Sequence, residues 1–118
     1  ARTVNGHARN VPDSVLARLP QNGGIVMVVA LPRFISEGLR QWGARREAET
    51  ARLKALWLGQ PAKVAEGLAA WDKANPEPVS TIKDMADHID HIRKVAGVEH
   101  IGIGGDFDGM PSGPVGFE

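Results

Sequence analysis

Two short apolar runs stand out in an otherwise mixed pattern of hydrophobic and polar residues. The first, Ile25–Leu31, is continuously apolar and rich in β-branched side chains, and Pro32 follows it. The second lies within Val98–Gly109, where an apolar, glycine-flanked segment precedes two carboxylates and a glycine turn. Continuous apolar runs of this length are typical of parallel strands buried on both faces. The pattern therefore predicts two buried strands.

Helical periodicity and local start and stop signals account for most of the remaining chain. They predict one helix that begins near Pro12 and stops at Pro20, one from Ser36 to about Leu58, one that Pro61 opens, and one from Thr81 to Gly97. The last helix has the clearest start, because Thr81 and Asp84 are spaced as a capping box. Its expected buried face carries Ile82, Met85, Ala86, Ile89, Ile92 and Val95.

The order of these elements indicates the fold class. Two buried strands joined through helices imply a parallel crossover, which places the chain in the α/β class. Two parallel strands cannot make a covered sheet, and a complete (β/α)8 barrel takes about 250 residues. With 118 residues, the chain is expected to be a slice of a larger α/β domain.

Composition narrows the classes of partner. Basic and acidic residues number 14 each, so no net field attracts nucleic acid or an anionic membrane. Cysteine is absent, which excludes disulfides and thiolate metal sites. No apolar run approaches the roughly 20 residues of a membrane span. The first residues, Ala1–Gly6, contain neither a signal-peptide core nor an initiator Met, so we expect the chain to begin inside a larger protein.

The segment Asp87–His91 concentrates metal-type and acid/base side chains. His88 and His91 are three residues apart, so on one helix face they could bind zinc. The alternative is a solvated or helix-packing polar face, in which Asp84 pairs with His88 and Asp87 with His91. The spacing favours the alternative, because it differs from the zinc-protease pattern of histidines four residues apart.

Asp106 and Asp108 follow the second strand, where α/β folds keep their chemistry. A dinucleotide-binding loop would need glycine at Phe107, and a calcium loop would need Asp or Asn at Met110. Both alternatives fail. The two carboxylates remain candidates for metal binding, for acid/base catalysis or for turn formation.

Arg9 is the third candidate. An arginine just before a helix start can bind a carboxylate through two parallel hydrogen bonds. The alternative is a surface arginine beside Asn10, which would act as a loop or capping residue.

Four motifs together resemble the membrane (renal-type) dipeptidase family, the M19 metallopeptidases. They follow the family order along the whole chain, and Gly-Gly-Asp-Phe-Asp-Gly is the most specific. The matching segments are His7–Asp13, Asn22–Val28, Ala86–Ile92 and Gly102–Gly109. The stretch from Glu37 to Pro78 resembles a helical insertion found in some bacterial members.

The resemblance implies the C-terminal β/α units of a TIM-like (β/α)8 metallohydrolase barrel, with residues 37–78 as a helical insertion. It implies two zinc ions whose ligands lie upstream of residue 1, since Ala1-Arg2 matches the end of the family's His-Ser-Ser-Ala motif. His7 matches no ligand, so none of the zinc-binding residues is expected in this chain. Arg9 matches the arginine that binds the substrate's C-terminal carboxylate. Asp106 matches the aspartate that assists proton transfer to the departing amine, whereas Asp108 is expected to shape the turn.

The expected activity is therefore zinc-dependent hydrolysis of dipeptides, with this chain inactive alone. The expected partners are a dipeptide and, in a homodimer, a second copy, with no nucleic acid and no membrane span. The resemblance leaves the compartment open between the periplasm and the cytoplasm of a bacterium. The alternative function is a non-catalytic, barrel-derived module that binds a partner through exposed apolar edges.

Overall fold

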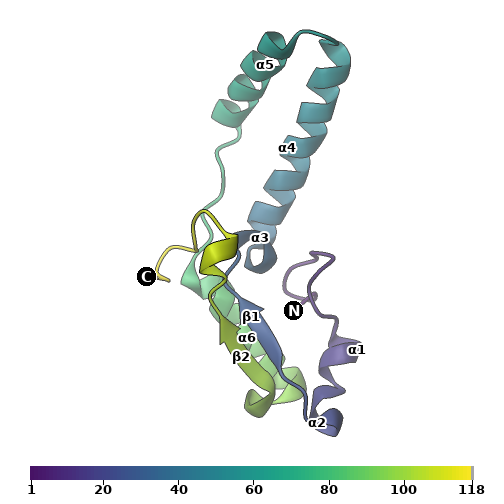
Figure 1. Ribbon diagram of the computed structural model, residues 1–118, viewed down its shortest axis with the longest axis vertical. Coiled ribbons are helices and arrows are strands. Elements are labelled where there is room, and N and C mark those ends of the chain that lie inside the picture. The colour runs from purple at the N-terminus through teal and green to yellow at the C-terminus, as the bar shows by residue number, and fades with distance from the viewer. Residues whose placement is uncertain (118) are drawn as a thin grey trace. The chain divides into compact units, whose positions relative to one another are not determined.

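The structure is a computed structural model that describes residues 1–117. It contains two compact units, one formed by residues 1–40 with the segment that begins at Val79, the other by Gln41–Pro78. The elements, in chain order, are α1 (Asp13–Leu16), α2 (Leu19–Asn22), β1 (Val26–Val29), α3 (Pro32–Ile35), α4 (Glu37–Leu56), α5 (Pro61–Ala74), α6 (Ile82–Ala96), η1 (Val98–His100), β2 (Ile101–Gly104) and η2 (Phe107–Gly109) (Figure 1). Within the described range, no helix is long and apolar enough to cross a membrane.

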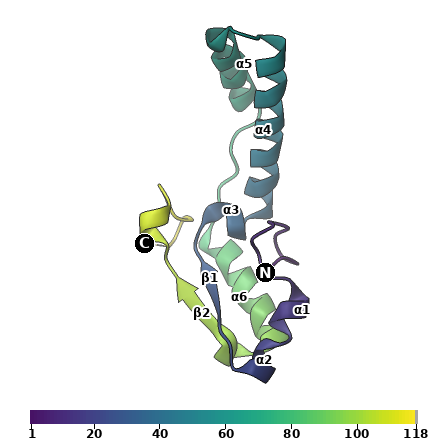
Figure 2. The ribbon, with the colours of Figure 1, turned by 45° about the vertical axis from the view of Figure 1, so that its right-hand side comes forward.

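The first unit is built on a parallel pair of strands. β1 pairs with β2 in a register that runs from Val26 opposite Ile101 to Val29 opposite Gly104. Helix α6 returns the chain to the start of β2 and lies along the strand pair (Figures 1 and 2). The parallel crossover predicted from the element order is thus confirmed, and with it the α/β class.

Local signals set the ends of α6 as the sequence predicts. The Thr81 side chain accepts from the backbone of Asp84, and the Asp84 carboxylate accepts from the Thr81 amide at 2.8 Å. Gly97 ends the helix with φ of 96°, a conformation that side-chain-bearing residues rarely adopt. The capping box and the glycine stop therefore give α6 well-defined ends.

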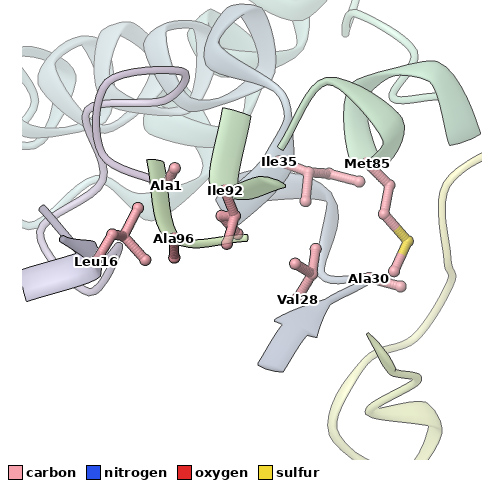
Figure 3. Close-up of a cluster of buried hydrophobic side chains, with 8 residues drawn as sticks. All are labelled: Ala1, Leu16, Val28, Ala30, Ile35, Met85, Ile92 and Ala96. Carbon is pink, nitrogen blue, oxygen red and sulfur yellow. The ribbon is translucent and has the colours of Figure 1, made fainter. Parts of the chain in front are cut away.

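The core of this unit lies between α6, α1 and one face of β1 (Figure 3). Leu16, Met85 and Ile92 expose 2% of their surface or less. Burial of such side chains is worth about 1.5–3 kcal/mol each, which makes this cluster the main source of stability in the unit. The other buried apolar members are Ala1, Val28, Ala30, Ile35 and Ala96.

The opposite face of the strand pair is open. Ile25, Met27 and Ile103 expose 61%, 55% and 62% of their surface. The prediction that both strands are buried on both faces is therefore wrong for residues 1–117. Successive side chains of a strand point to opposite faces, and α6 covers one of them. In the described part of the chain, the other face has no covering layer.

Two predicted helix boundaries also differ. Pro20 does not stop the first helix but lies in the first turn of α2, a position where its missing N–H costs nothing. Ser36 does cap a helix, since its hydroxyl accepts from the Leu39 amide at 3.4 Å. That helix is α4, which ends at Leu56, two residues before the predicted end.

The second unit is a helical hairpin of α4 and α5. The indole rings of Trp42 and Trp71 lie 5.9 Å apart, and the Trp42 Nε1–H donates to the Asn75 carbonyl at 2.8 Å. Arg46 forms a two-point ion pair with Asp72 at 2.7 and 2.8 Å. Pro61 begins α5 as predicted. The description of residues 37–78 as an insertion stays a prediction.

Candidate substrate-binding site

Two asparagines hold the N-terminal loop, residues 1–10, against α3. Asn5 is 1% exposed and donates from Nδ2 to the Arg33 carbonyl at 3.1 Å. Asn10 donates from Nδ2 to the carbonyls of Asn5, at 3.0 Å, and Phe34, at 2.8 Å. These amide groups satisfy backbone carbonyls that no helix or strand pairs. The loop that carries Arg9 is therefore fixed by polar contacts.

Arg9 lies over an aromatic ring. Its guanidinium carbon is 4.9 Å from the centroid of the Phe34 ring, within cation–π range. Its backbone N–H donates to Nδ1 of His7 at 3.1 Å, and the His7 ring also packs on Phe34, with centroids 4.4 Å apart. Within residues 1–117 the guanidinium makes no ion pair. Its hydrogen-bond donors remain available to a ligand.

A cavity of about 170 Å³ opens beside this arginine. Arg9 and Phe34 line it together with β1 and two side chains of α6, His88 and Ile92. The walls combine apolar side chains with the polar side chains of Arg9, Asn10 and His88. The cavity can therefore hold a ligand whose anionic end faces Arg9.

Asp106 follows β2 in a left-handed conformation, with φ of 56°. This backbone region is sparsely populated by residues other than glycine and recurs at functional sites. The chain then enters η2, and the Gly109 amide donates to the Asp106 carbonyl at 3.0 Å. Asp106 and Asp108 are both exposed. A solvent-facing carboxylate at such a position can exchange protons with a ligand.

Arg9 and Asp106 lie beyond the same edge of the strand pair. The Phe34 ring that contacts Arg9 lies in α3, just after β1, and Asp106 comes two residues after β2. Because the strands are parallel, their carboxyl ends meet at one edge (Figures 1 and 2). Asp106 is not among the residues that line the 170 Å³ cavity. The structure thus places both residues at one edge without placing them in contact.

The histidines of α6 have partners other than those predicted. His88 is 2% exposed; its Nε2 lies 3.2 Å from the Ile35 carbonyl and its Nδ1 lies 2.5 Å from the Ala1 nitrogen. His91 pairs with Asp13 at 2.8 Å, and this hydrogen bond lowers the pKa of the Asp13 carboxyl. The predicted pairings with Asp84 and Asp87 are therefore wrong. Both histidines serve helix packing, the broader alternative to zinc binding.

The described residues do not fit a metal site. Within residues 1–117, no three histidine, aspartate or glutamate side chains come close enough together to hold a metal ion. His88 is also unsuited to metal binding, because both ring nitrogens have partners. Burial is the largest cause that lowers the pKa of His88, to about 4.

The sequence pattern does not predict Asn5 or Phe34 as parts of the site, and the four-residue spacing predicts the wrong partner for His88. An aromatic residue just past a predicted strand end was the one available signal for Phe34. The contacts of Asn5 and His88 join residues 28 to 87 positions apart, which no local pattern reveals.

Comparison with known proteins identifies the family of this chain. An uncharacterized dipeptidase, C965.12, of Schizosaccharomyces pombe is 39% identical over 118 residues, which is all of this chain and 20% of that protein. The dipeptidase tcpJ of Claviceps purpurea is 32% identical and the dipeptidase aclJ of Aspergillus oryzae 31%, each over 95% of this chain and 17% and 18% of their own lengths. The chain thus spans about a fifth of these relatives. Residues 1–118 also match in full the family described as membrane dipeptidase, peptidase family M19, and the chain therefore belongs to that family.

Proposed function

We propose that this chain forms the C-terminal β/α units of a (β/α)8 barrel that hydrolyses dipeptides with the help of zinc. The observation that carries the proposal is the guanidinium of Arg9, which makes no ion pair within residues 1–117 and lines a cavity beside β1. The carboxyl end of β1 lies next to that of β2, which Asp106 follows. The open face of the strand pair, with Met27 and Ile103 exposed, suits the inner face of a barrel, where such side chains pack against those of other strands.

Arg9 binds the C-terminal carboxylate of the substrate in this proposal. A planar guanidinium matches a carboxylate through two parallel hydrogen bonds. Phe34 supports its position from below, and the asparagine contacts fix the loop. An arginine held at a fixed distance from the reacting bond would select substrates of dipeptide length.

Asp106 moves the proton. Hydrolysis of a peptide bond adds a hydroxyl to the carbonyl carbon and a proton to the departing amine. A carboxylate at the position of Asp106 can accept the proton of the attacking water and deliver it to the amine nitrogen. The zinc ions that the family resemblance implies would be held by residues other than those described, since residues 1–117 offer no such cluster.

The test uses the full-length protein, assayed for kcat and KM with a dipeptide and with its C-terminal amide. Arg9→Ala should raise KM for the free dipeptide roughly 10- to 100-fold, the value of one charge-assisted pair. Exposed Arg18→Ala is the matched control and should change neither constant. Asp106→Asn should lower kcat by about 10²- to 10⁴-fold. Asp108→Asn, two residues further on within η2, should leave kcat unchanged; equal losses in both variants would contradict the assignment.

A non-catalytic module is the second candidate function. The observation that favours it is the exposed apolar face formed by Ile25, Met27 and Ile103. The same assay separates the two candidates. A full-length protein that binds zinc but hydrolyses no dipeptide would favour the module, whereas turnover that depends on Asp106 would exclude it.

A further inference from the structure

His88 lines the cavity beside Arg9, and both of its ring nitrogens are hydrogen-bonded within the protein. The Ile35 carbonyl is only an acceptor, so Nε2 must carry the proton and donate. In the neutral ring, Nδ1 is then an acceptor, which matches the donor nitrogen of Ala1. Both bonds are buried, and the two partners lie 53 and 87 residues away in sequence.

Those two partners belong to the two segments that build the arginine site. Ala1 begins the loop that ends with Arg9, and its carbonyl accepts from the Asn5 amide at 3.2 Å. Ile35 is the last residue of α3, next to the Phe34 ring that supports the guanidinium. His88 therefore ties both segments to α6, the helix that anchors the core.

We propose that His88 is a positioning residue that sets the place of Arg9 relative to the cavity by holding the N-terminal loop and α3 to one point on α6. This inference rests on the proposed role of Arg9 in binding the substrate carboxylate. Both ring nitrogens of His88 are engaged within the protein, so neither offers a hydrogen bond to the substrate. His88 determines where the guanidinium and its supporting ring lie, and an error of about 1 Å there can cost 10²-fold.

Two substitutions in the full-length protein separate the two bonds. His88→Asn places an amide oxygen near the Nδ1 position and retains the acceptor for Ala1, but it loses the donor to Ile35. His88→Gln reaches the Nε2 position with an amide N–H and retains that donor, but it loses the acceptor. We expect each to raise KM for a dipeptide about tenfold while kcat stays within twofold.

Met85→Ala is the matched control for lost stability, because Met85 lies on the same helix, 1% exposed, and does not line the cavity. It should lower the melting temperature without raising KM. In an Arg9→Ala background the His88 variants should raise KM no further, since the group they position is gone.

The outcomes separate this inference from the proposed function. If Arg9→Ala leaves KM unchanged, both are wrong. If Arg9→Ala raises KM but the folded His88 variants do not, or if they raise it equally in the Arg9→Ala background, the positioning role alone is wrong. If neither variant folds, His88 contributes to stability alone, and the inference is likewise overturned.

Discussion

Gly109 offers a way to displace the Asp106 carboxylate without changing its charge. A Cβ built on Gly109 would lie 2.4 Å from Oδ1 and 2.9 Å from Cγ of Asp106, whereas ordinary contacts begin at 3.4 Å. The substitution Gly109→Ala should therefore push the carboxylate aside by about 1 Å. The backbone itself should accept alanine, because Gly109 is not among the residues with positive φ in the described chain.

The expected cost falls on turnover. A displacement of about 1 Å in a proton-transfer group is worth about 10²-fold, which corresponds to about 2.7 kcal/mol of activation free energy. The fold should not weaken, since replacing glycine by alanine at a compatible position stabilises by about 0.4–1 kcal/mol. Gly109→Ala should thus lower kcat about 100-fold while the melting temperature stays constant or rises.

Gly113→Ala is the matched control, because a Cβ there meets nothing closer than the Met110 methyl group at 3.4 Å. Steady-state kinetics with a dipeptide and a thermal melt, on the full-length protein, measure both effects. In an Asp106→Asn background, Gly109→Ala should add little to the loss of kcat. Wild-type turnover of Gly109→Ala, or an equal loss in Gly113→Ala, would refute the reasoning that carboxylate placement limits the rate.

Three further outcomes are expected. Because burial lowers the pKa of His88 to about 4, the unfolded chain binds a proton below pH 6.5 that the folded chain does not. The free energy of unfolding should therefore fall by about 3 kcal/mol from pH 6.5 to pH 4. In denaturant unfolding, a His88→Gln variant should lack this loss. Leu16→Ala removes a fully buried side chain and should destabilise by about 2–5 kcal/mol in the same measurement. The isolated 118-residue chain with added zinc should release no amino acid from a dipeptide; hydrolysis above background would show that the implied zinc ligands are not needed.

The parts of the fold that the sequence predicts are those set by neighbours a few residues apart. The capping box of Thr81 and Asp84 and the stop at Gly97 involve contacts within one helical turn, so their spacing is visible in the chain. The exposure of Met27 was not predictable in the same way. A β-branched run shows that a strand forms, but the layer that covers each face comes from distant segments.

The candidate site shows the same difference between local and long-range contacts. Asp106 was found from its place after a strand, and its placement depends on the local turn through Gly109. Arg9 was found by motif, but its support comes from His88 and Phe34, which are distant in sequence.

This difference has a kinetic consequence. Because Asp106 is held by contacts within four residues, changes confined to Gly105–Gly109 should act on kcat and leave KM nearly unchanged. Arg9 depends on a loop and on α3, both tied to α6 through His88. Changes at that attachment point should act on KM first. A substitution in α6 that lowered kcat while KM stayed constant would mean that the two halves of the site are coupled more closely than their separate hydrogen bonds indicate.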